Sequence, residues 1–187
     1  MGARRVVSHN DVVRGGCRYF LQHGTIDMDA LAVSLCISRA TLYRVVHSRD
    51  RLLGDVFWKL SERQLAIARK ARTCTGVDGV LEVTRPFCAR LLAAKPFRTF
   101  LAHEPDTAAR VLFTPAGGVH QRVVAVQKEI LIEAARTGDS WLAGDLDRLA
   151  YLYVRIFESM LYADLLTNFP PDFDLAERAA KALLQAA

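Results

Sequence analysis

The sequence is poor in the residues and runs that mark several large classes of protein. It has only 11 glycines and 6 prolines in 187 residues, too few for a linker-rich or low-complexity chain. Its uncharged stretches are all shorter than the ~18 residues that a membrane span needs. No apolar run follows the two arginines near the N-terminus, so we expect no export signal. We therefore expect a globular protein that stays in the cytoplasm.

The four cysteines and five histidines do not have the spacing of a metal site. Cys17, Cys36, Cys74 and Cys88 include no C-x2-C pair, and a reducing cytoplasm argues against disulfide bonds. Three of the cysteines lie among apolar neighbours, which predicts small buried side chains. We expect neither a bound metal nor a cofactor.

The sequence also lacks the short motifs of common enzyme classes. It contains no G-x-S-x-G, no H-E-x-x-H, no phosphate-binding P-loop and no dinucleotide-binding glycine pattern. We therefore expect no catalytic residues and no enzymatic activity. A small helical enzyme stays an alternative, with His103 and Glu104 as its acid–base pair.

Positive charge is concentrated in the first 72 residues. They hold 13 Lys and Arg against 6 Asp and Glu, a formal charge of +7, whereas the remaining residues hold 12 against 14. A basic segment joined to a near-neutral, more hydrophobic one indicates polyanion binding at the N-terminal end. A solvated basic surface would have the same charge, so a motif is needed to decide.

Apolar residues recur at helical spacing along nearly the whole chain, and no segment shows the alternation of a strand. The pattern predicts an all-α protein of about nine helices, separated by turns rich in glycine and proline. The first four helices are predicted at 10–23, 28–35, 39–46 and 49–71. Ser8 is the candidate cap of the first, and Asp11 three residues later makes a shortened version of the capping box. The last two are predicted at 145–168 and 172–185.

Residues 28–46 have the features of a helix-turn-helix. Ala32 is small where the two short helices must approach, and Ser38 can cap the second one. Cys36 occupies the tight turn, whose left-handed backbone usually selects glycine and costs another residue roughly 1 kcal/mol. The second helix leaves small, basic and hydrogen-bonding residues on one face, as a helix entering the major groove requires. An αα-hairpin without a role in DNA binding is the alternative.

Residues 38–53 resemble the signature of TetR-family transcriptional regulators. The run Ser-Arg-Ala-Thr-Leu-Tyr at 38–43 matches the common Ser-(Lys/Arg)-(Gly/Ala)-Thr-(Leu/Ile)-Tyr. Ser-Arg-Asp at 48–50 and Leu-Leu at 52–53 follow the common Ser-Lys-Glu and Leu-Leu, while Val45-Val46 replaces His-Phe. The resemblance implies a three-helix DNA-binding domain over 1–48. A long helix would join it to a helical effector-binding and dimerisation domain over 49–187.

The resemblance also assigns contacts to DNA. It implies that Tyr43 and Arg49 bind phosphates, which set affinity, whereas contacts to base edges set sequence choice. Arg4 and Arg5 are either an arm in the minor groove or a solubilising tail, and His47 either contacts phosphate or is a surface turn residue. The predicted DNA-binding residues are Arg4, Arg5, Ser38, Arg39, Ala40, Thr41, Tyr43, Arg44, His47 and Arg49.

The predicted helix at 145–168 is apolar almost all round, so it must be covered on more than one side. As in the family, we expect this helix and the closing one to form a four-helix homodimer interface, whose symmetry matches operator half-sites. A core helix in a monomer is the alternative. The predicted interface residues are Leu149, Tyr153, Ile156, Met160, Leu175, Ala179, Ala182 and Leu183.

The resemblance further implies an effector pocket among the helices between about 77 and 160. A largely apolar pocket with a few polar anchors suits a small amphiphilic molecule such as a lactone or an acyl compound. An ordinary core or surface role is the alternative for every candidate, and Arg155 and Glu158 can pair with each other. The candidate lining residues are Phe87, Arg90, Phe97, Phe100, His103, Trp141, Arg155, Glu158 and Tyr162.

These observations lead to one main hypothesis. The chain is a ligand-responsive homodimeric regulator that binds double-stranded operator DNA, a repressor released by its small-molecule effector. A small helical enzyme and a ligand-independent DNA-binding or nucleoid protein are the alternatives. The latter would bind DNA without regard to sequence.

Overall fold

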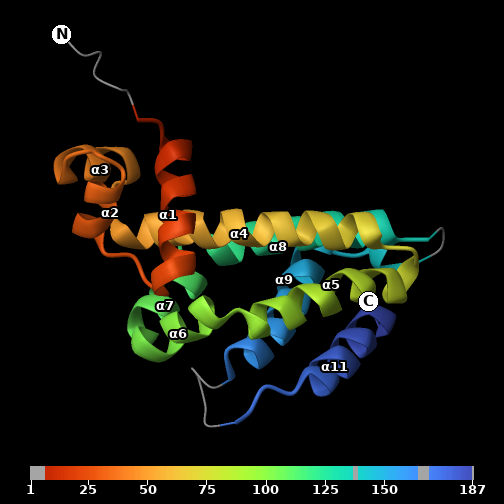
Figure 1. Cartoon of the computed structure of the whole chain (residues 1–187). Coiled ribbons are helices and arrows are strands. Elements are labelled where there is room, and N and C mark those ends of the chain that lie inside the picture. Colours follow the sequence, from red (N-terminus) through yellow and green to blue (C-terminus); the bar gives the residue numbers. More distant parts are fainter. Residues whose placement is uncertain (1–6, 137–138, 164–168, 187) are drawn as a thin grey trace. The chain divides into compact units, whose positions relative to one another are not determined.

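The structure is a computed structural model that describes residues 7–136, 139–163 and 169–186. In these ranges it consists of ten α-helices and one short 3₁₀ helix, η1, without strands (Figure 1). The all-α class is therefore confirmed. The helices are α1 (His9–His23), α2 (Met28–Ser34), α3 (Arg39–Val46), α4 (Arg49–Ala71), α5 (Gly76–Ala93), α6 (Lys95–His103), α7 (Pro105–Phe113), α8 (Val119–Ala134), η1 (Ser140–Ala143), α9 (Leu146–Leu161) and α11 (Phe173–Ala186).

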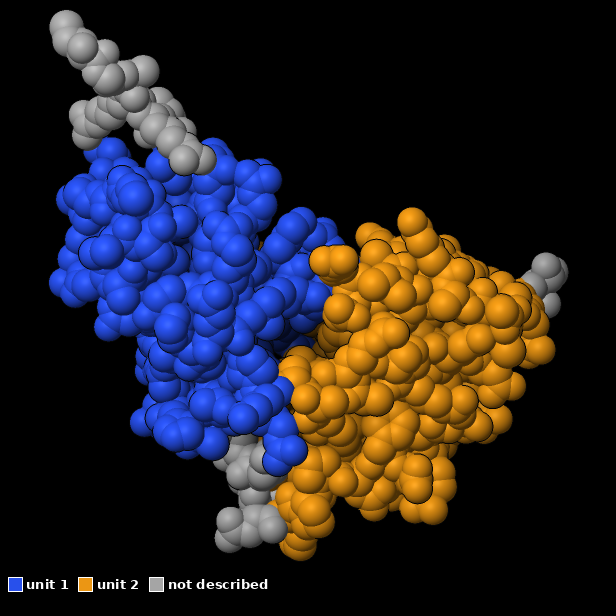
Figure 2. Space-filling model, viewed as in Figure 1, with its two compact units in different colours: residues 1–62, 95–120 blue, residues 63–94, 121–187 orange. Residues whose placement is uncertain are grey.

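The chain divides into two compact units, shown in separate colours in Figure 2. Unit 1 comprises residues 1–62 and 95–120, and unit 2 comprises residues 63–94 and 121–187. Unit 1 therefore contains α6, α7 and the first part of α4 (residues 49–62) in addition to the three N-terminal helices. The functional boundary between residues 48 and 49 stays a prediction.

Short-range capping contacts explain where the first helices begin and end. Ser8 and Asp11 form the predicted capping box, in which each side chain bonds the other residue's backbone N–H at 3.2 Å. Gly24 ends α1 in the left-handed conformation, with φ of 69°. Asp27 caps α2, and Ser38 caps α3 by accepting a hydrogen bond from the Thr41 N–H.

Four phenylalanines form the centre of unit 1. Phe57 of α4 packs edge-to-face against Phe20 of α1, with ring centroids 5.0 Å apart. Phe57 also packs against Phe97 and Phe100 of α6, at 5.5 and 5.2 Å. Because such aromatic pairs add to the burial of large apolar area, this cluster fixes α1, α4 and α6 to one another.

Unit 2 has a core formed by α5, α9 and α11, and this core includes a buried contact between two hydroxyl groups. Tyr153 of α9 is 1% exposed, and its hydroxyl lies 2.9 Å from the hydroxyl of Thr84 on α5. At the surface, Arg85 of α5 forms a fork-like pair with Glu177 of α11, at 2.5 and 2.7 Å. The pair ties α11 to α5 on the side of α5 that faces solvent.

All four cysteines are free thiols, but only two of them are buried. Cys17 and Cys88 lie in the two cores, whereas Cys36 and Cys74 are exposed. The prediction of three buried cysteines was therefore wrong for Cys36. Its sequence neighbours are apolar, but it lies in a turn at the surface. Burial raises the pKa of the Cys88 thiol to about 12. No helix in the described ranges is long and apolar enough to span a membrane.

Candidate DNA-binding site

Helices α2 and α3 form the predicted helix-turn-helix. The turn is closed by hydrogen bonds from Cys36 N–H to Val33 O and from Ile37 N–H to Ala32 O, both at 3.0 Å. Cys36 has a φ of 54°, the left-handed value expected from its place in the motif. Leu31 and Leu42 are fully buried at the crossing of the two helices.

The outer face of α3 is open to solvent in the described structure. Arg39, Ala40 and Arg44 are exposed, while Thr41 and Tyr43 are half-buried. The Arg39 guanidinium lies 5.5 Å from the centre of the Tyr43 ring and forms an exposed pair with Asp29 at 3.0 Å. Such an exposed pair is worth little, so Arg39 can exchange it for a phosphate or a base.

The junction between α3 and α4 is a strained γ-turn at His47. This residue is exposed and has φ of 66° and ψ of −50°. The turn is closed by a 2.8 Å hydrogen bond from the Ser48 N–H to the Val46 carbonyl. Ser48 then caps α4, since its hydroxyl accepts a hydrogen bond from the Arg51 N–H at 3.1 Å.

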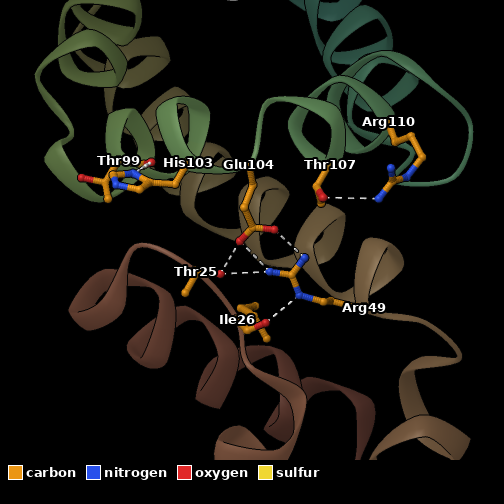
Figure 3. Close-up of polar contacts among 8 residues, drawn as sticks. All are labelled: Thr25, Ile26, Arg49, Thr99, His103, Glu104, Thr107 and Arg110. Carbon is orange, nitrogen blue, oxygen red and sulfur yellow. Dashed lines mark hydrogen bonds and ion pairs between the residues drawn. The ribbon is translucent and has the colours of Figure 1, made fainter.

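Arg49 differs from the other predicted DNA contacts because its guanidinium is engaged inside unit 1. It binds the Glu104 carboxylate, the Thr25 hydroxyl and the Ile26 carbonyl (Figure 3). The hydrogen bonds that Glu104 accepts, first those from Arg49 and then the one from the Thr25 hydroxyl, hold the pKa of Glu104 below its usual value. The phosphate contact of Arg49 stays a prediction, and the guanidinium has Glu104, Thr25 and Ile26 as its partners in this structure.

Two comparisons with known proteins agree with this geometry. A family model described as the tetracyclin repressor-like C-terminal domain matches residues 75–185, more than half of the chain. The chain belongs to the TetR family. It is also similar to a solved structure of the R. erythropolis transcriptional repressor QsdR from the TetR family, with a TM-score of 0.85 and 26% identity, covering 94% of this chain and 93% of that one. No curated protein sequence matches.

In this TetR-family chain, the candidate effector residues fall in different places. Phe97, Phe100 and His103 belong to unit 1, where both phenylalanines pack in the aromatic cluster and His103 is exposed. The others belong to unit 2: Phe87, Arg90, Trp141, Arg155, Glu158 and Tyr162. Of these, Trp141, Glu158 and Tyr162 are buried, and Arg155 pairs with Glu158 at 2.9 Å.

Sequence reasoning missed one polar residue in unit 2. Gln127 of α8 is 6% exposed, and its Nε2 has no hydrogen-bond partner among the described residues. The Nε1 of Trp141 in η1 is the other buried side-chain donor of the described ranges without a partner. The sequence could have indicated Gln127, because it lies four residues after Val123 and three before Ile130, which is the spacing of one face of a helix. Buried donors are normally satisfied, so these two require an explanation.

The predicted dimer residues are divided between core and surface. Leu149, Tyr153 and Met160 of α9 are buried in the core of unit 2, and Ile156 is half-buried. On α11, Leu175, Ala179 and Ala182 are exposed and Leu183 is half-buried. The TetR-family chain exposes two further large side chains of α9, Tyr151 and Leu152, at 46% and 43%.

Two remaining predictions concern other parts of the chain. Arg4 and Arg5, proposed as a minor-groove arm, lie outside the described residues. Within the described ranges, no group of three or more His, Cys, Asp or Glu side chains is arranged to hold a metal ion.

Proposed function

We propose that this TetR-family protein is a homodimeric repressor that binds operator DNA through α3 and leaves it when a small effector binds. The observation that carries the proposal is the open, basic outer face of α3, with Arg39, Ala40 and Arg44 exposed. Side chains on such a helix can reach base edges in the major groove, while neighbouring basic groups contact phosphates.

Exposed apolar side chains of unit 2 support the dimer. Tyr151 and Leu152 of α9 and Leu175 of α11 are each more than 40% exposed. The exposed alanines Ala179 and Ala182 allow a second helix to approach closely. Because a two-fold dimer presents two recognition helices, it would match half-sites about 34–36 Å apart on one face of the duplex.

The two unpartnered donors support an effector with hydrogen-bond acceptors. Gln127 Nε2 and Trp141 Nε1 are buried and have no hydrogen-bond partner among the described residues. A carbonyl group, as in a lactone or an acyl compound, would satisfy such a donor, while an acyl chain would fill apolar space. The effector releases DNA only in so far as it binds one subunit arrangement more tightly than the other.

Fluorescence anisotropy tests the DNA-binding part of the proposal. The purified protein is titrated into labelled duplex from the region upstream of its own gene, and into a scrambled duplex of the same composition. We expect the upstream duplex to bind at least ~10³-fold more tightly. Equal affinity for the two duplexes would support the nucleoid alternative, and no binding at low salt would contradict the proposal.

Release experiments test the effector part. The operator complex is titrated with acyl lactones of graded chain length and with alcohols of matched length that lack the carbonyl. Release by the lactones alone, at a higher concentration for Gln127→Leu and Trp141→Phe, supports a carbonyl held by these donors. Equal release of wild type and both variants would contradict it.

A further inference from the structure

Arg49, Glu104, Thr25 and Ile26 form one hydrogen-bonded cluster in unit 1, here called the Arg49 clamp (Figure 3). Arg49 Nη1 and Nη2 each donate to one oxygen of Glu104, both at 2.7 Å. Nη2 also donates to the Thr25 hydroxyl at 2.9 Å, and Nε donates to the Ile26 carbonyl at 2.6 Å. The Thr25 hydroxyl in turn donates to Glu104 at 2.5 Å.

The clamp leaves Arg49 little capacity for another ligand. Four of the five guanidinium N–H groups are used, and the side chain is only 28% exposed. A fork of two parallel hydrogen bonds to a carboxylate is among the stronger polar contacts in proteins. A DNA phosphate would therefore have to displace a charged group that is already well placed.

The position of the clamp along the chain points to its role. Thr25 and Ile26 lie just before Asp27, the cap of α2, and Arg49 directly follows the turn after α3. The clamp therefore joins both ends of the helix-turn-helix. Between α3 and Arg49 lies the strained turn at His47. A residue in such a conformation persists only where its surroundings hold it, and Arg49 anchors the chain two residues further on.

We propose that Arg49 and Glu104 are positioning residues of the DNA-binding site: Arg49 fixes the ends of the helix-turn-helix to Glu104 instead of binding a phosphate. Glu104 lies between α6 and α7, so these helices share the anchoring of α2 and α3. The inference rests on the proposed DNA-binding function. It departs from the family resemblance, which gave Arg49 a phosphate.

The salt dependence of operator binding separates the two roles. Each phosphate contact contributes about 0.9 to the slope of log affinity against log salt concentration. We expect Arg49→Gln and Glu104→Gln each to weaken binding about tenfold with an unchanged slope, and the double variant to be no weaker than either alone. A slope reduced by ~0.9 in Arg49→Gln, with equal or tighter binding by Glu104→Gln, would overturn the inference.

Two further variants sharpen this experiment. Arg49→Lys keeps the charge but not the fork, so it should bind as weakly as Arg49→Gln; near wild-type affinity would indicate a phosphate contact. Arg110→Gln is the matched control, because Arg110 of α7 also pairs with the first turn of α4, through Asp50 at 2.9 Å, without touching Thr25 or Ile26. The operator affinity of Arg110→Gln should fall less than about twofold, because the ion pair that it removes is exposed. A tenfold loss of affinity, equal to that of Arg49→Gln, would overturn the specific role of Arg49.

Hydrogen–deuterium exchange tests the clamp without DNA. In Glu104→Gln, the amides of residues 28–46 should exchange faster than in the wild type, while those of α5 in unit 2 stay protected. Unchanged exchange in 28–46, or equal acceleration in α5, would overturn the inference. If the wild type fails to bind its upstream duplex, the proposed function fails, and this measurement still decides whether the clamp holds the helix-turn-helix.

Discussion

Gly54 of α4 lies so close to Gly117 that a Cβ added to Gly54 would be 2.0 Å from the Gly117 carbonyl oxygen. Both residues belong to unit 1, and the obstructing atom is backbone, which cannot rotate away. We expect Gly54→Ala to lower the free energy of unfolding by about 1–3 kcal/mol, although alanine favours the helix by ~1 kcal/mol. Chemical denaturation measures the change.

Gly144 is the matched control for this prediction. It is exposed, and the nearest atom to an added Cβ is 3.8 Å away. Gly144→Ala should leave the free energy of unfolding within about 0.5 kcal/mol of the wild type. Equal effects of the two substitutions would show that the close approach of Gly54 to Gly117 is absent in solution.

The left-handed conformation of Cys36 predicts that glycine is favoured at this turn. The φ of 54° strains any residue with a Cβ, so glycine removes this strain from the folded state. Glycine also gives the unfolded chain more conformational freedom, which offsets part of the gain in stability. We expect Cys36→Gly to be more stable than Cys36→Ala by about 0.5–1 kcal/mol in thermal unfolding. Both variants lack the thiol, so they differ only in the presence of a Cβ and in the backbone freedom that it removes. A less stable glycine variant would contradict the turn geometry.

The buried hydroxyl pair of Thr84 and Tyr153 predicts an asymmetric pair of mutations. Thr84 also bonds the Val80 carbonyl at 3.1 Å, so Tyr153→Phe leaves Thr84 satisfied and should cost about 1 kcal/mol. Thr84→Val leaves the buried tyrosine hydroxyl without this hydrogen bond and should lower the free energy of unfolding by more, about 1–3 kcal/mol. The double variant should be more stable than Thr84→Val alone. Additive losses in a double-mutant cycle would contradict the hydrogen bond.

Glu82 predicts a pH dependence of stability in unit 2. Its carboxylate accepts hydrogen bonds from the Cys74 and Thr73 N–H groups and from the Thr73 hydroxyl, which lowers its pKa from 4.5 to about 2. Because the pKa is lower in the folded state, Glu82 stabilises the protein above pH 4.5 and loses this contribution as the pH falls towards 2.

Comparing Glu82→Gln with the wild type tests this linkage. We expect the wild type to have the larger free energy of unfolding in urea at about pH 6, and the difference from Glu82→Gln to shrink as the pH falls to about 3. A constant difference between the two proteins across this range would mean that Glu82 does not hold its pair of backbone N–H groups in solution.

The elements that the sequence predicted well depend on short-range chemistry. The capping box of Ser8 and Asp11 and the cap at Ser38 each involve residues three positions apart. The left-handed turn at Cys36 follows from the spacing of two adjacent helices. Such signals are complete within a few residues, so helices α3 and α4 have the bounds that the sequence predicted.

The roles that the sequence could not assign depend on contacts between distant residues. Arg49 has the residue type of a phosphate ligand, but its partner Glu104 is 55 positions away. Phe97 and Phe100 have the residue type of pocket lining, yet they pack against Phe57. Residue type alone cannot distinguish these roles, because it carries no information about which helices pack against each other.

In helix α9, too, the sequence did not decide which residues face the core. Its apolar residues surround the axis almost completely, so the sequence could not say which of them face the subunit's own core. The structure buries Leu149 and Met160 and exposes Tyr151 and Leu152. Packing against other helices of unit 2, α5 and α11 among them, makes this choice, and the exposed pair is where we expect the partner subunit.

The central claim is that the outer face of α3 reads base edges, and operator variants test it most directly. The affinities of the wild type and Arg44→Ala are measured for the operator and for duplexes with each base pair replaced in turn. We predict that Arg44→Ala loses about 1–3 kcal/mol of binding and tolerates every base at one position, while other preferences persist. A uniform loss across all duplexes, or unchanged affinity and preference, would contradict the claim.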